Sequence, residues 1–210
     1  MNEENIKISM IRCSCYRYTF QPEKLRQLVK SKIEGNKILN LFAGKTILDE
    51  REVRVDCDNT MPKLTYNMKA EEFLQINKDS YDTIIYDPPW NARKSKEKYQ
   101  GHYIGKFTKL KDDIVDILNM GGIIISASYE IDNFGIKRGM KLEEVIVVNA
   151  GGEIRPFFIT IERKIKNIIF EEKKEIYNNL LKNKCPKCES KMVKVNDKYY
   201  CIKIGCNYHE

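Results

Sequence analysis

Apolar residues in this chain fall into two patterns, short continuous runs and longer stretches in which they recur at helical spacing. The continuous runs, rich in isoleucine and valine, predict buried strands. Strands are expected at 37–44, 53–59, 63–67, 81–87, 121–129, 143–150 and 156–164, the last two as a closing antiparallel pair. Helices are expected at 21–35, 70–76 and 106–119. Strands that alternate with helices indicate an α/β fold whose sheet is mostly parallel and covered on both faces.

Two connections between the predicted strands are short. About nine residues follow Gly44 before the next strand, fewer than a crossover helix needs. The segment 57–62 is shorter still, so one or both of these connecting helices is expected to be reduced to a turn. The carboxyl ends of parallel strands commonly carry the active site. Gly44, Asp56 and Asp87 all lie at such ends.

Composition limits the class of protein. With 210 residues, 42% of them apolar, the chain can bury one full core and carry a small appendage. The apolar runs are too short to cross a bilayer, and the polar N-terminus is unlike a secretory signal. We therefore expect a cytoplasmic location and no membrane partner. The net charge of +7, from 37 basic and 30 acidic residues, suits either a polyanionic partner or a solvated lysine-rich surface.

The stretch IIYDPPWN ends an apolar run with an acid, two prolines and the only tryptophan of the chain. Asp87 offers a carboxylate acceptor just past a strand end. Pro88 and Pro89 have no N–H and restricted φ angles, so their carbonyl groups are fixed acceptors. Trp90 offers a flat face on which an extruded base stacks, worth about 1–3 kcal/mol. The stretch predicts a pocket for an amino group; a loop that only ends the strand is the alternative.

The tetrapeptide DPPW resembles the catalytic motif of the S-adenosylmethionine (SAM)-dependent amino-methyltransferases, which modify adenine N6 or cytosine N4. This resemblance implies a class I, Rossmann-like methyltransferase sheet with SAM as its cofactor. It also implies that Asp87, Pro88, Pro89 and Trp90 are catalytic.

A second segment, LNLFAGKT, resembles the cofactor loop of that family, in which an apolar strand ends in Phe-x-Gly-x-Gly. Phe42 and Gly44 match this pattern, whereas Thr46 stands in place of the second glycine. Asp56 matches the acid that holds the ribose hydroxyls of the cofactor, and Lys69 stands where an aspartate is usual. The cofactor-binding residues that the resemblance implies are Leu41, Phe42, Ala43, Gly44, Asp56, Asn67 and Ala70.

The segment 91–109 is rich in lysine and interleaved with aromatic residues. Loops of this composition track phosphates and hold unstacked bases, although a solvated surface loop is the alternative. The candidate contacts to nucleic acid are Arg93, Lys94, Lys96, Lys98, Tyr99 and Tyr103.

Four of the seven cysteines lie close to the end of the chain. Cys185 and Cys188 form a CxxC pair, and Cys201 and Cys206 follow as a second pair. Four thiolates in two pairs suit a tetrahedral Zn²⁺ ion, which would supply most of the folding energy of so small a unit. The segment resembles zinc ribbons, with His209 as an alternative to Cys206; a redox pair is a further alternative.

We expect a methyltransferase domain at 1–164, a helical linker at 165–184 and a zinc ribbon at 185–210. The expected function is SAM-dependent methylation of an exocyclic amino group in nucleic acid. RNA, including ribosomal RNA, is favoured over DNA, because direct readout of DNA needs an element in the major groove and little chain follows the sheet. A DNA amino-methyltransferase, a catalytically inactive RNA-binding scaffold and an additional protein partner stay open as alternatives.

Overall fold

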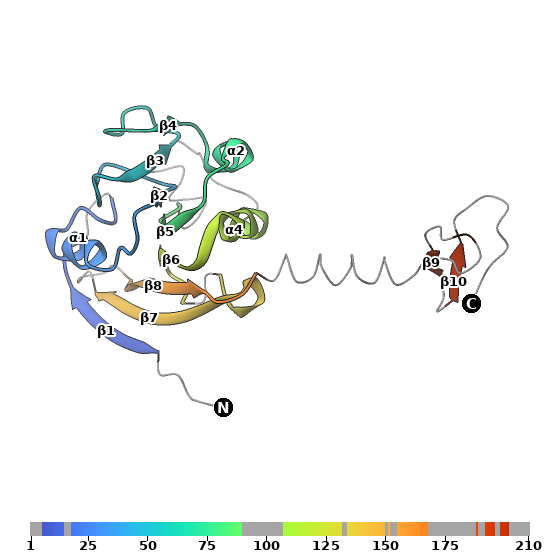
Figure 1. Cartoon of the computed structure of the whole chain (residues 1–210). Helices are drawn as coiled ribbons and strands as arrows, with labels where there is room; N and C mark the ends of the chain where they lie inside the picture. Colours follow the sequence, from blue (N-terminus) through green and yellow to red (C-terminus); the bar gives the residue numbers. More distant parts are fainter. Residues whose placement is uncertain are drawn as a thin grey trace. The chain divides into compact units, whose positions relative to one another are not determined.

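The computed structural model describes residues 6–14, 18–89, 107–131, 134–149, 151, 155–167, 188, 192–195 and 198–201. The chain divides into two compact units, Met1–Lys166 and Asn167–Glu210. The first unit holds one eight-stranded sheet in the order β1-β7-β8-β6-β5-β2-β3-β4 (Figure 1). Its strands are β1 Lys7–Arg12, β2 Ile38–Asn40, β3 Glu52–Asp56, β4 Tyr66–Asn67, β5 Tyr81–Tyr86, β6 Leu118–Ser128, β7 Met140–Asn149 and β8 Phe157–Lys164.

The directions of the strands confirm a mostly parallel sheet with an antiparallel closing strand. The five strands from β6 to β4 pair in parallel. Strand β8 runs antiparallel to both of its neighbours, β6 and β7, and β1 pairs in parallel with β7 at the edge. Strand β1 was not predicted from the sequence. Its outward side chains Ile8 and Met10 are 73% and 74% exposed, so the strand lacks the continuous buried run of the inner strands.

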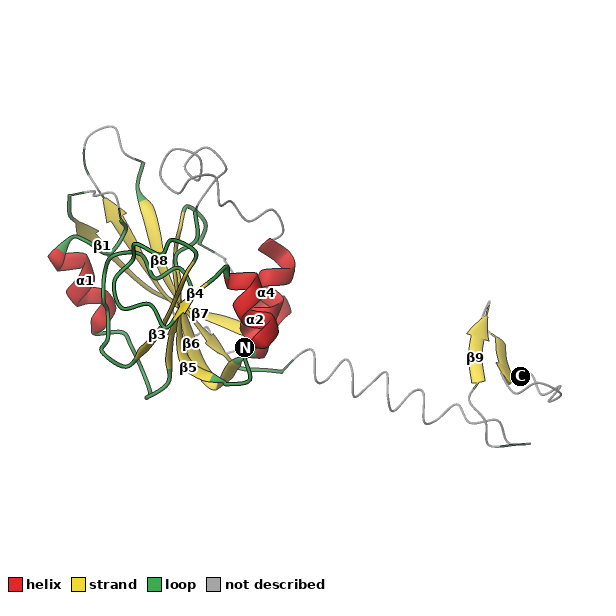
Figure 2. Cartoon of the chain, turned by 90° about the horizontal axis from the view of Figure 1, so that it is seen from above, coloured by secondary structure: helices red, strands yellow, loops and turns green. Residues whose placement is uncertain are grey.

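Helices cover both faces of the sheet, as expected for an α/β fold. Figure 2 shows α2 (Ala70–Ile76) and α4 (Phe107–Asp116) on one side and α1 (Glu23–Lys30) on the other. Phe73 and Ile114 join the core on the first side, and Leu25 and Val29 join the core on the second. Helix α1 is shorter than the predicted 21–35, because the chain turns after Lys30 and Gly35 takes a φ of 73°.

Neither of the two short connections forms a helix, as their lengths predict. The backbone after β2 runs as a loop over 41–51, and the backbone after β3 runs as a loop over 57–65. At this side of the sheet, loops therefore take the place that crossover helices have elsewhere.

Asp82 on β5 ties together the ends of the strands that lie away from these loops. Its Oδ2 accepts the backbone N–H groups of Asn36 and Lys37 at 2.9 and 3.0 Å, and its Oδ1 accepts from Asn119 Nδ2 at 2.8 Å. The hydrogen bond from Lys37 is the largest of the effects that hold the pKa of Asp82 below its ordinary value of 3.8.

Replacing Asp82 by asparagine is therefore expected to lower the free energy of unfolding at neutral pH by about 1–2 kcal/mol. Because the folded-state pKa lies below the unfolded value, this stability is fully present above pH 3.8 and is lost as the pH falls through the folded pKa. Urea unfolding of both proteins between pH 3 and 7 tests this. A stability difference that stays constant down to the lowest pH would contradict it.

Candidate active site

One cavity opens at the carboxyl ends of β2, β3 and β5. Its lining includes four segments that are far apart in the sequence: 41–46 after β2, 56–58 at the end of β3, 68–71 at the start of α2, and Asp87 with Pro89 after β5. The parallel arrangement brings these segments together, because parallel strands end at the same edge of the sheet. Leu41, Phe42, Ala43, Gly44, Asp56, Ala70, Asp87 and Pro89, all singled out by sequence analysis, line this cavity.

The loop after β2 is fixed to both neighbouring strands. Leu41 N–H donates to Ile85 O on β5 at 3.2 Å, and Ala43 N–H donates to Val55 O on β3 at 3.1 Å. Gly44 has a φ of 53°, which a side chain disfavours, and an added Cβ would lie 3.4 Å from Tyr18 Cδ1. A glycine at this position therefore lets the backbone turn and lets a ligand approach it closely.

The Asp56 carboxylate bonds two backbone segments at the rim of the cavity. Its Oδ2 accepts the Gly44 N–H at 2.9 Å and its Oδ1 accepts the Asp58 N–H at 2.9 Å. Each carboxylate oxygen has a second lone pair for a ligand hydroxyl group. Asn67, which sequence analysis named beside it, does not line the cavity: its side-chain Nδ2 donates to the Asp56 carbonyl oxygen at 3.0 Å.

Asp87 and Pro89 form the far side of the cavity, whereas Pro88 is buried and does not line it. Tyr86, the preceding residue, is 1% exposed and stacks edge-on between Phe42 and Phe134, with ring centroids 5.7 and 5.2 Å away. Burial raises the pKa of the Tyr86 hydroxyl well above its usual value, so this ring stays neutral. The packing of these three aromatic rings in the core fixes the position of the backbone at Asp87.

Several cavity residues were missed by sequence analysis. Tyr18, Thr19 and Phe20 come from the segment before α1, and Met61 and Met68 come from the loops before and after β4. No local pattern marks the N-terminal segment as part of a site, because its approach to Gly44 is a tertiary contact. The remaining lining residues are Lys45, Thr46, Cys57, Asp58, Lys69 and Glu71.

The other predicted site residues lie mostly outside the described residues. These are Trp90, Arg93, Lys94, Lys96, Lys98, Tyr99, Tyr103, Cys185 and Cys206. In the second unit, strands β9 (Met192–Val195) and β10 (Lys198–Cys201) pair antiparallel. The described residues, among which is Cys188, hold no group of three or more side chains suited to a metal ion.

No family model matches the sequence, and no curated protein matches it. Among solved structures, a candidate SAM-dependent methyltransferase from Streptococcus mutans gives a TM-score of 0.51 at 16% identity, over 69% of this chain and 49% of that one. SMU.776, a candidate methyltransferase in complex with SAH, gives a TM-score of 0.50 at 18% identity, over 66% of this chain and 48% of that one. The chain shares the fold of these two solved structures.

The similarity to these methyltransferases concerns the fold, because the identities are low. The chain spans about half the length of the two matched structures. Within the part that the structure describes, no helix is long and apolar enough to span a membrane.

Proposed function

We propose that this chain is a SAM-dependent methyltransferase that modifies an exocyclic amino group, adenine N6 or cytosine N4, in nucleic acid. The main observation in support of the proposal is that two acidic residues and a glycine turn line the same cavity. Asp56, Asp87 and Gly44 come from the ends of three parallel strands and all line it. The methyltransferase fold of the solved neighbours supports the proposal.

The lining of the cavity fits SAM. Asp56 keeps lone pairs for the ribose hydroxyls, and the positive φ of Gly44 lets backbone N–H groups approach a ligand. Phe20, Met61 and Met68 supply apolar surface for an adenine ring. SAM supplies an electrophilic methyl group when it is bound.

Asp87 has the role of orienting the amino group of the substrate. Its carboxylate accepts an amino hydrogen and turns the nitrogen lone pair toward the cavity. Positive charge develops on that nitrogen in the transition state, and a fixed carboxylate stabilises it. Pro89, which lines the cavity, contributes a carbonyl acceptor, and Trp90 stacks on the base, as the resemblance to the motif implies.

Structured RNA is the favoured substrate. A looped or bulged base in folded RNA is unstacked at little cost, whereas a base in duplex DNA has to be extruded. The net charge of +7 supports a polyanionic partner. The candidate phosphate contacts follow the motif directly in the sequence; they are Arg93, Lys94, Lys96 and Lys98.

Nucleoside mass spectrometry with isotopically labelled SAM tests the proposal. The protein is incubated separately with unmodified total RNA and with genomic DNA, and an Asp87→Ala variant serves as control. Label in N6-methyladenosine or N4-methylcytidine, absent with the variant, is the expected result. Label in deoxynucleosides alone would identify a DNA enzyme, and no label from folded protein would favour the inactive scaffold.

We also propose that Cys185, Cys188, Cys201 and Cys206 bind one Zn²⁺ ion. The antiparallel β9–β10 hairpin follows the first cysteine pair in the sequence, and Cys201 of the second pair is the last residue of β10. Four thiolates are the usual ligands of a closed structural zinc site. Native mass spectrometry is expected to find one zinc per chain. A strong chelator is expected to unfold the second unit and leave the first intact, since metal binding supplies the folding energy of such units. NMR spectra in which the hairpin signals survive chelation would contradict this.

A further inference from the structure

The β2–β3 connection, residues 41–51, carries no helix although it joins two parallel strands. Parallel strands are usually joined by a crossover that contains a helix. In a helix at this place, the carbonyl groups of residues 43–46 would accept N–H groups from four residues further along the chain. These carbonyl groups, next to the cavity, need another partner.

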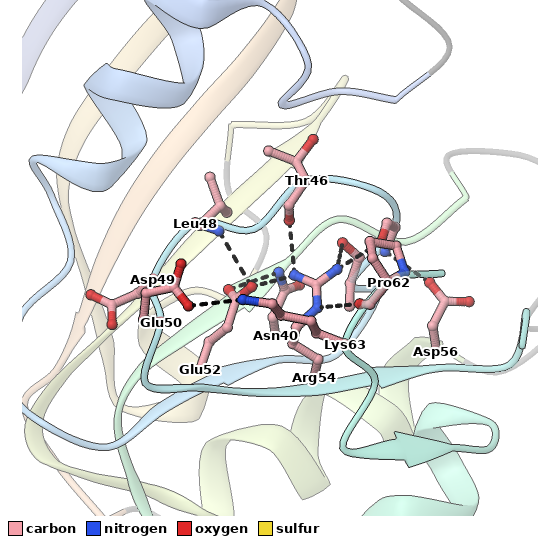
Figure 3. Close-up of polar contacts among 12 residues, drawn as sticks. Asn40, Thr46, Leu48, Asp49, Glu50, Glu52, Arg54, Asp56, Pro62 and Lys63 are labelled. Atoms are coloured by element: carbon pink, nitrogen blue, oxygen red, sulfur yellow. Dashed lines mark hydrogen bonds and ion pairs between the residues drawn. The ribbon is translucent and has the colours of Figure 1, made fainter. Parts of the chain in front are cut away.

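Arg54 on β3 supplies that partner (Figure 3). Its side chain is 2% exposed and lies under the loop. The guanidinium donates to the carbonyl oxygens of Gly44 at 2.7 Å, Thr46 at 2.8 Å and Ala43 at 3.2 Å. Its Nε donates to Pro62 O at 3.1 Å, in the loop that follows β3. One side chain thus ties together both loops that replace crossover helices.

Glu52 holds the guanidinium in place. It pairs with Arg54 Nη1, and its side chain is 1% exposed. The same carboxylate accepts hydrogen bonds from Asn40 Nδ2 at 3.2 Å and from the Leu48 N–H at 3.3 Å, so it is bonded to the end of β2 and to the later part of the β2–β3 connection. A buried arginine with a paired carboxylate and four carbonyl acceptors is fully satisfied, which such a group requires.

The bonds to Arg54 also set the direction of the loop amides. In a trans peptide the N–H points opposite to the C=O. The Ala43 and Gly44 carbonyls point at Arg54, so the N–H groups of Gly44 and Lys45 point away from it. The Gly44 N–H indeed reaches Asp56 Oδ2 at 2.9 Å, on the rim of the cavity.

We propose that Arg54, held by Glu52, is a positioning residue for the cofactor: it orients the peptides of residues 43–45 so that their N–H groups hold Asp56 and bind the ligand. Arg54 does not line the cavity itself. The inference rests on the proposed function, because the ligand it serves is SAM.

The test compares the conservative variant Arg54→Lys with the wild-type protein. Lysine keeps the charge but cannot bond four carbonyl groups in a fixed fork. The affinity for S-adenosylhomocysteine, measured by calorimetry, is expected to fall about tenfold or more. KM for SAM is expected to rise by the same factor, while kcat at saturating SAM changes little. The double variant E52L/R54M leaves no unpaired buried charge and is expected to lose affinity similarly.

Lys164→Met is the matched control for a purely structural effect. Lys164 is 5% exposed and donates to Val115 O and Leu118 O at 2.7 Å, next to α4 and away from the cavity. This variant is expected to lower Tm but to keep the affinity for the ligand. If folded Arg54→Lys kept the wild-type affinity for the ligand, or if Lys164→Met lost as much affinity, the inference would be wrong while the proposed function would still stand. Failure of the wild-type protein to bind the ligand would overturn the proposed function with it.

Discussion

Replacing Asp87 by alanine is expected to lower kcat by about 10²–10³-fold, because the variant loses the carboxylate that faces the developing charge on the amino nitrogen. The dissociation constant for SAM should stay within a factor of about two, since Asp56 and the Gly44 loop, which bind the cofactor, are unchanged. Single-turnover rates and calorimetric titrations measure the two effects separately.

Two further variants sharpen this prediction. Asp87→Asn keeps a carbonyl acceptor without the charge, so its rate should lie between those of wild type and Asp87→Ala. Asp113→Asn makes the same change in an exposed carboxylate that pairs with Lys109 on α4, and it should leave the rate unchanged. An Asp87→Ala protein that loses ligand affinity and turnover equally would count against a role in orienting the amino group.

Replacing Asp56 by alanine is expected to show the opposite pattern. Hydrogen bonds to a charged group contribute about 1.5–3 kcal/mol, which corresponds to roughly a 10- to 100-fold loss of SAM affinity. The loss should lie toward the upper end, because Asp56 also accepts the N–H groups of Gly44 and Asp58. Turnover at saturating SAM should be largely retained, since Asp87 and the substrate side of the cavity are intact.

Asp49→Ala is the control for Asp56→Ala. Asp49 lies in the β2–β3 connection and bonds the side chain of Arg51 at 2.8 and 2.9 Å, but it does not line the cavity. Its removal should leave KM for SAM unchanged. If Asp49→Ala raised KM as much as Asp56→Ala does, the ribose-binding role of Asp56 would be wrong.

Elements that local sequence determines were predictable. Helix α2 occupies 70–76 as its apolar spacing predicts, and β5, β7 and β8 lie within about three residues of the expected ranges. The short connections correctly predicted loops, because the number of residues alone rules out a full crossover helix. Strand β1 was not predicted, since its place at the edge follows from pairing with the distant β7.

The site was predictable where residues follow strand ends. Gly44, Asp56 and Asp87 meet because the sheet is parallel, and that arrangement follows from the pattern of strands and helices. Tyr18 and Phe20 were not predictable, because the path of the segment before α1 depends on tertiary packing. The role of Arg54 was indicated by one feature of the sequence: Glu52, Arg54 and Asp56 alternate with two valines in β3, which places the three charged residues on one face.

The central claim is that the cavity at the ends of β2, β3 and β5 binds the cofactor. Hydrogen exchange of the wild-type protein, with and without saturating S-adenosylhomocysteine, tests it most directly. Bound ligand is expected to slow exchange in peptides that cover 41–46, 56–58 and 68–71, and to leave α4 unchanged. Unaltered exchange in all three segments, or protection confined to another part of the chain, would contradict the account.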